Sequence, residues 1–277
     1  MFFADDLKIY LTVRDQADCR ELHILLELFN NWCERNLMML CVAKCCIISF
    51  RRARSVIQFD YNVAGIPLQR VNHIKDLGVV LDEGLTFIHH FSSTIDKANR
   101  QLGFMFKISK DFCDPLCFKA LYCSLVRSLL EFASVVWNPY QAVWSARFEA
   151  VQRRFVRNAL RYLPWSDPLS LPPYADRCRL LGLESLAERR NASNAIFIAK
   201  ILLAEYDVPE LLARIDFYAP ARSLRPRTLL FESPTFTNYA ANSSLAASIR
   251  RFNEVSEYFD FNSTSAHLRR RLLSNRP

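Results

Sequence analysis

The sequence predicts an α+β protein in which a mixed region, residues 1–85, is followed by helices. Segments rich in β-branched and aromatic residues, bounded by turn residues, are concentrated before residue 85. From residue 86 onward, apolar residues recur at spacings of three and four, which is typical of helices. The chain has 277 residues, 51% of them hydrophobic, so it is long enough for one large or two small domains.

The first region, 1–85, is expected to combine one helix with several strands. Phe2 and Phe3 lead into a tight turn and predict a hairpin there. A helix is expected to begin near Asp15, because apolar residues at helical spacing follow it. Ala64-Gly65 predicts the turn of a second hairpin. Further strands are expected at three places: 45–50, 57–63 and 73–81.

Two helical regions are expected to follow. The first, 86–163, contains three predicted helices, at 87–109, 115–136 and 143–162. A proline-rich stretch then marks a linker and opens the third region, 164–277. In that region helices are expected at three places: 174–181, 185–206 and, as the last helix, 243–259. The chain ends in a basic, partly disordered tail that contains Arg269-Arg270-Arg271.

The adjacent carboxylates of Phe3-Ala4-Asp5-Asp6 are the first candidate for chemistry. Carboxylate oxygens are the ligands that Mg²⁺ prefers, and phosphoryl transfer commonly uses a pair of such ions. Two neighbouring Asp residues at a hairpin tip therefore predict half of a metal site, with a further carboxylate supplied by another strand. The alternative is a solvated turn, since Asp favours turns for local reasons.

Six segments stand out by their order and spacing along the chain: FADDLKIY, NWCERN, AKCCIISF, HIKDLGVVLD, KALYCSLVRSLLEFASVVWNP and FEAVQRRFVRNALR. Together they resemble the reverse transcriptase of non-LTR (LINE-type) retrotransposons, most closely the jockey-like group. The resemblance extends over essentially the whole chain. It implies a partial polymerase palm of hairpins and a helix over 1–85, a mainly helical thumb over 86–163, and a C-terminal helical region.

Site residues follow from the resemblance. It implies that Asp5 is a metal ligand and that Asp6 belongs to the same catalytic cluster, with Mg²⁺ as the cofactor of the intact enzyme. It also implies that Lys44 is a catalytic residue that donates a proton to the departing pyrophosphate; an ordinary solvated Lys is the alternative. The segment from Leu77 to Asp82 is similar to the primer-grip hairpin, where Gly78 permits close backbone approach.

The chain departs from the family at its start. Intact members carry fingers, a first catalytic Asp and a template-gripping segment before the Asp-Asp motif, and an endonuclease domain before those. Here only Met1 and Phe2 precede Phe3-Ala4-Asp5-Asp6. The chain is therefore expected to be a C-terminal fragment that is inactive alone, whereas the intact enzyme would copy an RNA template from a DNA primer with dNTP substrates.

The third helix of the thumb-like region carries a basic face. Arginines recur at spacings of seven, three and four beside an apolar stripe: Arg147, Arg154, Arg157 and Arg161. Such a face is expected to follow the phosphates of RNA, DNA or a hybrid duplex. The alternative is a solvated face of an amphipathic helix, because arginines are common on helix surfaces.

Composition restricts the compartment and the remaining sites. A net charge of +8 fits a polyanionic partner, although proteins without such a partner also reach that value. The start lacks a signal-peptide pattern and the nine cysteines predict reduced thiols, so the protein is expected to be nuclear or cytoplasmic and not secreted. Cysteine spacing does not favour zinc. The longest apolar run, 37–43, is too short for a membrane span.

Two other functions are compatible with the sequence. One is a non-catalytic nucleic-acid-binding protein that uses the arginine face; the other is an inert relic of a retrotransposon.

Overall fold

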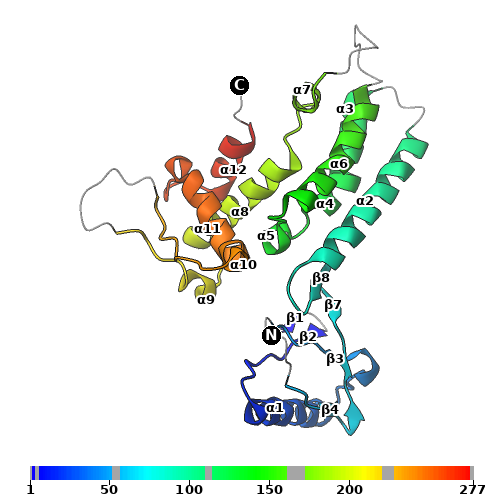
Figure 1. The fold of residues 1–277 in the computed structure, drawn as a ribbon, viewed down its shortest axis with the longest axis vertical. Coiled ribbons are helices and arrows are strands. Elements are labelled where there is room, and N and C mark those ends of the chain that lie inside the picture. The colour runs from blue at the N-terminus through cyan, green and yellow to red at the C-terminus, as the bar shows by residue number, and fades with distance from the viewer. Residues whose placement is uncertain are drawn as a thin grey trace. The chain divides into compact units, whose positions relative to one another are not determined.

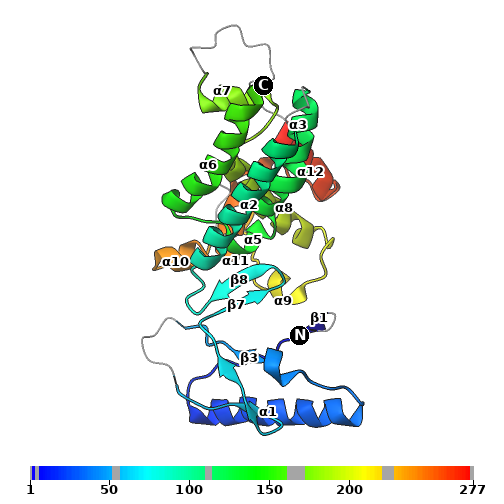
Figure 2. The ribbon, with the colours of Figure 1, turned by 90° about the vertical axis from the view of Figure 1, so that its right-hand side faces the viewer.

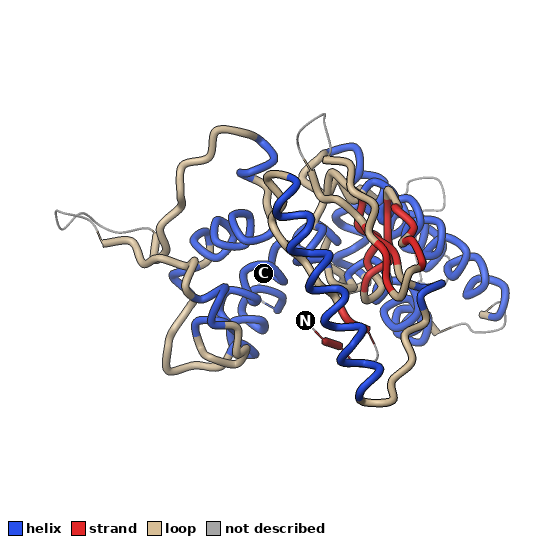
Figure 3. Tube along the Cα trace, turned by 90° about the horizontal axis from the view of Figure 1, so that it is seen from below, coloured by secondary structure: helices blue, strands red, loops and turns tan. Residues whose placement is uncertain are grey.

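A computed structural model of the chain describes residues 2–3, 6–51, 57–109, 114–160, 172–219 and 228–274. Within these ranges the chain is mostly helical, and its strands are short and few (Figure 1, Figure 3). This agrees with an α+β class at the level of element types. The chain divides into two compact units, Met1–His90 and Phe91–Pro277. The assignment of residues 1–85 to a polymerase palm stays a prediction, as does a separate region that begins at residue 164.

Two-stranded ladders and one long helix are the main regular elements in the described part of the first unit. Three ladders are antiparallel and one is parallel. The antiparallel pairs are β1 (Phe2–Phe3) with β2 (Asp6–Leu7), β4 (Asn62–Val63) with β5 (Ile66–Pro67), and β7 (His73–Asp76) with β8 (Val79–Asp82). The parallel pair is β3 (Cys46–Ile47) with β6 (Gln69–Arg70).

Two of the hairpins turn through pairs of residues with positive φ. Ala64 and Gly65 have φ of 50° and 76°, and Leu77 and Gly78 have φ of 45° and 92°. Positive φ at both central residues is typical of the type I′ turns that match the twist of paired strands. The hairpin predicted at Ala64-Gly65 is confirmed. The prediction of one strand over 73–81 is wrong, because Leu77-Gly78 reverses the chain.

The other two predicted strands, 45–50 and 57–63, are longer than the observed ones, β3 and β4. The Arg70 side chain explains part of the difference. Its guanidinium donates to the Phe59 carbonyl at 3.2 Å and to Ser49 Oγ at 2.5 Å. A carbonyl satisfied by a side chain needs no strand partner, so the backbone here runs as loop.

Helix α1 (Gln16–Arg35) begins as predicted. Asp15 is its N-cap, and the carboxylate accepts from the N–H groups of Ala17 at 2.7 Å and Asp18 at 3.1 Å. Such caps satisfy N–H groups that the helix itself leaves free. The buried side of α1 contributes Cys19 and Leu22 to a small core shared with Tyr61.

Helices make up most of the described part of the second unit. In chain order they are α2 (Ile88–Ile108, whose first turn lies in the first unit), α3 (Pro115–Leu121), the π-helical segment η2 (Tyr122–Arg127), α4 (Ser128–Glu131), α5 (Ser134–Trp137), α6 (Ala142–Ala159), α7 (Tyr174–Leu180), α8 (Leu186–Leu202), α9 (Pro209–Leu212), α10 (Asn238–Ala241), α11 (Ser244–Glu254), the 3₁₀ turn η4 (Ser256–Tyr258) and α12 (Ser265–Ser274).

The prediction of one helix over 115–136 is wrong. The backbone passes through a π segment, and helix α4 then ends at Phe132 and Ala133, where Ala133 has φ of 52°. The indole N–H of Trp137 donates to the Phe132 carbonyl at 2.8 Å. This bond satisfies a carbonyl freed by the break, which helps α5 to start in a new direction.

Two sets of buried side chains are prominent among the described residues of this unit. Aromatic rings pack between α2, α5 and α6, with Phe91, Trp137 and Phe148 in mutual contact. The other set lies where α8 packs against α11 and α12 (Figure 1). Helix α8 also packs against α5 and α6, so helices from both sides of residues 161–171 share the interior.

The prediction that 243–259 holds the last helix is wrong, because α12 follows it. Leu268 of α12 is 1% exposed in the core with α8. Glu205 accepts from both the N–H and the hydroxyl of Ser265, at 3.0 and 2.6 Å, which caps the start of α12. The residues of α8 and Glu205 that stabilise α12 are distant from it in sequence. The arginine run between Leu268 and Leu272 also makes their helical spacing hard to recognise.

Candidate functional site

The predicted hairpin at the Asp-Asp pair is present. Phe3 of β1 pairs with Asp6 of β2, so the connection consists of residues 4 and 5. Asp6 is exposed. Asp5 lies outside the described residues, so its role as a metal ligand beside Asp6 stays a prediction.

An ion pair joins the segment after β2 to the second hairpin of the same unit. Lys8 Nζ lies 2.5 Å from Asp76 Oδ1, and both side chains are about one quarter to one third exposed, at 32% and 26%. Asp76 ends β7, directly before the Leu77-Gly78 turn. The pair therefore holds the Asp6 strand beside the β7–β8 hairpin, a juxtaposition that was not predicted from the sequence.

Lys44 is exposed at the end of the short 3₁₀ turn η1 (Val42–Lys44). Cys45 follows it and connects η1 to β3. No ion pair joins Lys44 to Asp6 in the part of the chain that the structure describes. Nor do the described residues contain a group of three His, Cys, Asp or Glu side chains able to hold a metal ion. That Asp5 and Asp6 hold a metal ion therefore stays a prediction.

Three of the four predicted arginines lie on one exposed face of α6. Arg147, Arg154 and Arg157 are exposed, and at about 100° per residue they fall within an arc of about 80°. None forms an ion pair with a described carboxylate. Arg161 lies outside the described residues. Arg147 Cζ is 4.5 Å from the centre of the Trp144 ring, a cation–π contact that orients the guanidinium.

The opposite face of α6 is held by a buried amide. Gln152 is 0% exposed and uses both ends of its side chain. Its Nε2 donates to the Glu184 carbonyl at 2.8 Å and to Tyr174 Oη at 3.0 Å, while Oε1 accepts from Tyr122 Oη at 2.9 Å. The amide thus joins α6 to η2, to α7 and to the residue before the α8 cap.

Glu149, one turn earlier, is also buried, at 8% exposed. It accepts from the Tyr174 hydroxyl at 2.5 Å and from the Leu186 N–H, the first of α8, at 3.1 Å. A carboxylate at a helix N-terminus is stabilised by the free N–H groups there. Burial raises the pKa of Tyr174, and the hydrogen bond to Glu149 raises it further.

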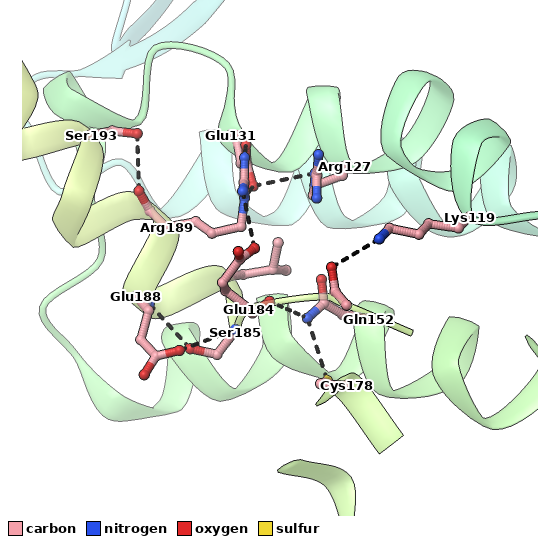
Figure 4. Close-up of polar contacts among 12 residues, drawn as sticks. Lys119, Arg127, Glu131, Gln152, Cys178, Glu184, Ser185, Glu188, Arg189 and Ser193 are labelled. Atoms are coloured by element: carbon pink, nitrogen blue, oxygen red, sulfur yellow. Dashed lines mark hydrogen bonds and ion pairs between the residues drawn. The ribbon is translucent and has the colours of Figure 1, made fainter. Parts of the chain in front are cut away.

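Charged side chains connect α8 to α4 (Figure 4). The Arg189 guanidinium forms a two-bond ion pair with Glu131, and its Nη1 lies 3.2 Å from Glu184 Oε2. Arg127 adds a longer contact to Glu131 at 3.7 Å. Burial alone would lower the pKa of Arg189, but the bonds to Glu131 and Glu184 raise it, which favours the charged form.

Arg190, the next residue, is 1% exposed. Its Nε donates to Asn138 Oδ1 at 3.1 Å, its Nη2 to Ser145 Oγ at 3.4 Å, and its Cζ lies 5.3 Å from the Phe148 ring centre. Burial lowers the pKa of Arg190 to about 10. Together with Gln152 and Glu149, this residue fixes the position of α6 and thereby of its arginine face.

These buried polar residues were not predicted from the sequence. One signal was available: Glu149 and Gln152 interrupt the apolar stripe that Phe148, Val151 and Phe155 form on α6. A polar residue inside such a stripe indicates either a register error or a buried hydrogen-bonded group. Its partners could not be found, because they lie 22 to 37 residues away.

The cysteines and the helix lengths bear on zinc binding and on membrane spans. The described cysteines are free thiols, and they do not gather into a metal-binding group with other described side chains. Among the described residues, every helix is too short or too polar to cross a bilayer.

The comparisons with known proteins add no relative. No family model matches the chain, and neither curated proteins nor solved structures give a match.

Proposed function

We propose that this chain binds nucleic acid along helix α6, as the duplex-holding part of a non-LTR retrotransposon reverse transcriptase. The observation that carries the binding proposal is the exposed arginine face of Arg147, Arg154 and Arg157. Phosphate oxygens are the usual partners of such guanidinium groups, which bind them in pairs of hydrogen bonds. The assignment to reverse transcriptases rests on the sequence resemblance.

Two properties of this face support binding over simple solvation. First, the face is free of ion pairs with described carboxylates, whereas Arg189 and Arg251 of the same unit are paired with Glu131 and Glu254. Second, the helix beneath is fixed by buried hydrogen bonds from Gln152 and Glu149. A rigid support lowers the entropy lost when side chains bind phosphate.

The catalytic part of the proposal concerns the β1–β2 hairpin. We propose that Asp5 and Asp6 bind Mg²⁺ and that Lys44 acts near the departing pyrophosphate when the rest of a polymerase site is supplied. The support is the predicted hairpin, which leaves Asp6 exposed, and the Lys8–Asp76 ion pair, which holds it beside β7 and β8. Two carboxylates alone bind a divalent ion weakly.

Salt-dependent binding tests the arginine face. We expect the chain to bind RNA and DNA duplexes with little sequence preference and with an affinity that falls as salt rises. Changing Arg147, Arg154 and Arg157 to Gln should reduce the slope of log K against log salt by up to about 3, since each phosphate contact contributes about 0.9.

A matched variant removes equal charge elsewhere. Arg269, Arg270 and Arg271 are exposed on α12, and changing all three to Gln should alter the slope far less. Equal effects of the two triple variants would mean that net charge, and not the α6 face, controls binding. An unchanged slope in the α6 variant would identify that face as a solvated surface.

Paramagnetic Mn²⁺ tests the metal ligands separately. Added Mn²⁺ should broaden amide NMR signals around residues 2–7, and Asp5→Asn or Asp6→Asn should abolish this broadening. Asp60→Asn, which removes an exposed carboxylate from a loop, serves as the control. Broadening that persists in both hairpin variants would reject the metal assignment while leaving the arginine face untouched.

A further inference from the structure

Helix α1 presents an apolar stripe to solvent, on a different side from its buried residues Cys19, Leu22 and Cys33. The stripe is made of large side chains that are about half exposed: Ile24 at 54%, Leu25 at 40%, Leu28 at 59% and Trp32 at 48%. Single exposed apolar residues are ordinary, but four large ones on one face of one helix are typical of a contact surface.

The spacing along this stripe is that of a coiled coil. Glu21, Leu25, Leu28, Trp32 and Arg35 follow one another at intervals of four, three, four and three. This is the a/d repeat of a heptad, in which every member lies on one seam of the helix. At about 100° per residue, the five side chains fall within an arc of about 80°. Figure 2 shows α1 as one unbroken helix over this length.

The two ends of the seam carry opposite charge. Glu21 stands at one end and Arg35 at the other, seven residues before and after Leu28. Both are exposed, and neither forms an ion pair with another described residue. Two antiparallel copies of α1 would bring Glu21 of each near Arg35 of the other. A parallel arrangement would instead place like charges together, which is unfavourable.

We propose that this seam is a self-association surface, at which α1 pairs with α1 of a second copy of the chain in an antiparallel, two-fold arrangement centred near Leu28. A two-fold interface requires a self-complementary surface, and a seam with opposite charges at equal distances from its centre is one. Antiparallel helices also align their dipoles favourably. This surface is independent of the nucleic-acid binding proposed for α6.

The expected dimer is reversible. One pair of 20-residue helices buries less than the roughly 1,600 Å² of a standard stable interface, so association in the micromolar range is expected. Sedimentation velocity on the full chain at about 1 to 100 µM therefore covers the transition. A reducing buffer excludes disulfide-linked dimers, since Cys41 is an exposed thiol.

Charge exchange tests the arrangement. Glu21→Arg and Arg35→Glu should each weaken dimerisation by about tenfold or more, because each places like charges together at both ends of the seam. The double variant, Glu21→Arg with Arg35→Glu, should restore the wild-type dissociation constant to within about threefold. Arg20→Glu is the matched control, because Arg20 is exposed and points about 100° away from Glu21.

Leu28→Gln tests the apolar centre. It should abolish dimerisation while leaving the helical circular dichroism signal unchanged, since Leu28 is 59% exposed within one chain. A wild-type chain that stays monomeric at about 100 µM would overturn the proposal. So would single charge variants that dimerise like wild type, or a double variant that fails to recover, because both results contradict antiparallel pairing.

Discussion

Gln152 is a residue on which several elements depend. Its amide makes hydrogen bonds with Tyr122, Tyr174 and the Glu184 carbonyl in an interior where water cannot replace it. A buried polar group that loses its partner costs about 1–3 kcal/mol, whereas the bond itself contributes less. The contribution of Gln152 therefore lies mainly in the groups that its removal would leave unsatisfied.

We expect Gln152→Leu to lower the free energy of unfolding by about 3 kcal/mol, since it leaves a carbonyl and two hydroxyls short of a partner. Urea unfolding followed by circular dichroism measures this. Gln141→Leu is the control, because Gln141 is exposed and makes no capping bond, so its effect should be close to zero. Similar losses in both variants would show that the hydrogen bonds of Gln152 contribute little.

His90 gives a dependence on pH. It is 5% exposed, and its Nδ1 accepts from the Val80 N–H at 3.2 Å. Burial lowers the pKa of His90 below its ordinary value of 6.5. The unfolded chain therefore binds a proton at a higher pH than the folded chain does. The contribution of His90 to stability is therefore present above about pH 6.5 and is lost as the pH falls toward the pKa of His90 in the folded state.

We expect His90→Asn to flatten the loss of stability between about pH 6.5 and 5, because the Asn side-chain oxygen can accept the same N–H without titrating. Thermal unfolding at a series of pH values measures the slope. His267→Asn provides the control, as His267 is exposed. If the slope in His90→Asn equals that of wild type, other groups determine the acid sensitivity.

The N-termini of α8 and α11 differ in how they are capped. The α8 N-terminus has a capping box: Ser185 Oγ accepts from the Glu188 N–H at 3.2 Å, and the Glu188 carboxylate accepts from the Ser185 N–H at 3.3 Å. In contrast, Ser243 stands at the N-cap of α11 without a side-chain capping bond. These two N-cap serines therefore differ in side-chain capping.

We expect Ser185→Ala to destabilise the protein by about 1 kcal/mol, the usual cost of losing an N-cap. In a chain of this size that corresponds to a decrease in melting temperature of about 2–4 °C. Ser243→Ala should change it by much less. Calorimetry of both variants decides the matter, and equal shifts would show that capping bonds do not determine stability here.

Elements fixed by local sequence were predictable, and those fixed by distant contacts were not. The helix starts at Asp15 and Ser185 and the turn at Ala64-Gly65 were predicted, because each of these residues acts on neighbouring backbone groups. The break after α4 depends on the Trp137 indole, and α12 depends on Glu205. The spacing of apolar residues contains no information about such partners. The predictions of one helix over 115–136 and of a last helix over 243–259 were therefore wrong.

In the candidate site, too, locally determined features were predictable and long-range contacts were not. Exposure of Arg147, Arg154 and Arg157 follows from helical spacing and was predictable. The network behind them was not, because Glu149 and Gln152 find their partners on other helices. For the hairpin, the sequence predicted the turn, while the Lys8–Asp76 pair joins residues 68 positions apart, a pairing that no local pattern indicates.

Besides the long helix α1, the described part of the first unit contains short strands, whereas that of the second unit is mainly helical. Described strands of the first unit are two to four residues long and occur only in two-stranded ladders, whereas α6 and α8 of the second unit are 18 and 17 residues long and largely buried on one side. Short ladders are marginal in water, and backbone bonds near the surface open most readily.

We expect native-state hydrogen exchange to reveal this difference. Amides of α6 and α8 should be the slowest, exchanging only when their unit opens as a whole, and amides of β3 to β6 should exchange at least about a hundredfold faster. Mass spectrometry of peptides from a labelling series provides the measurement. Equal protection in the two units would mean that they unfold as one cooperative block.

The π-helical segment η2 has a consequence for insertions and deletions. Each π turn takes one more residue than an α turn, so the segment displaces the side chains of α4 by about 100° from their places in an uninterrupted α-helix. That displacement contributes to directing Glu131 toward Arg189. Loss of a single residue between Tyr122 and Arg127 would make the helix regular, yet it would rotate Glu131 away from its partner. A frame-preserving deletion that improves local geometry would thus damage the fold, whereas the same deletion in an exposed loop would be tolerated.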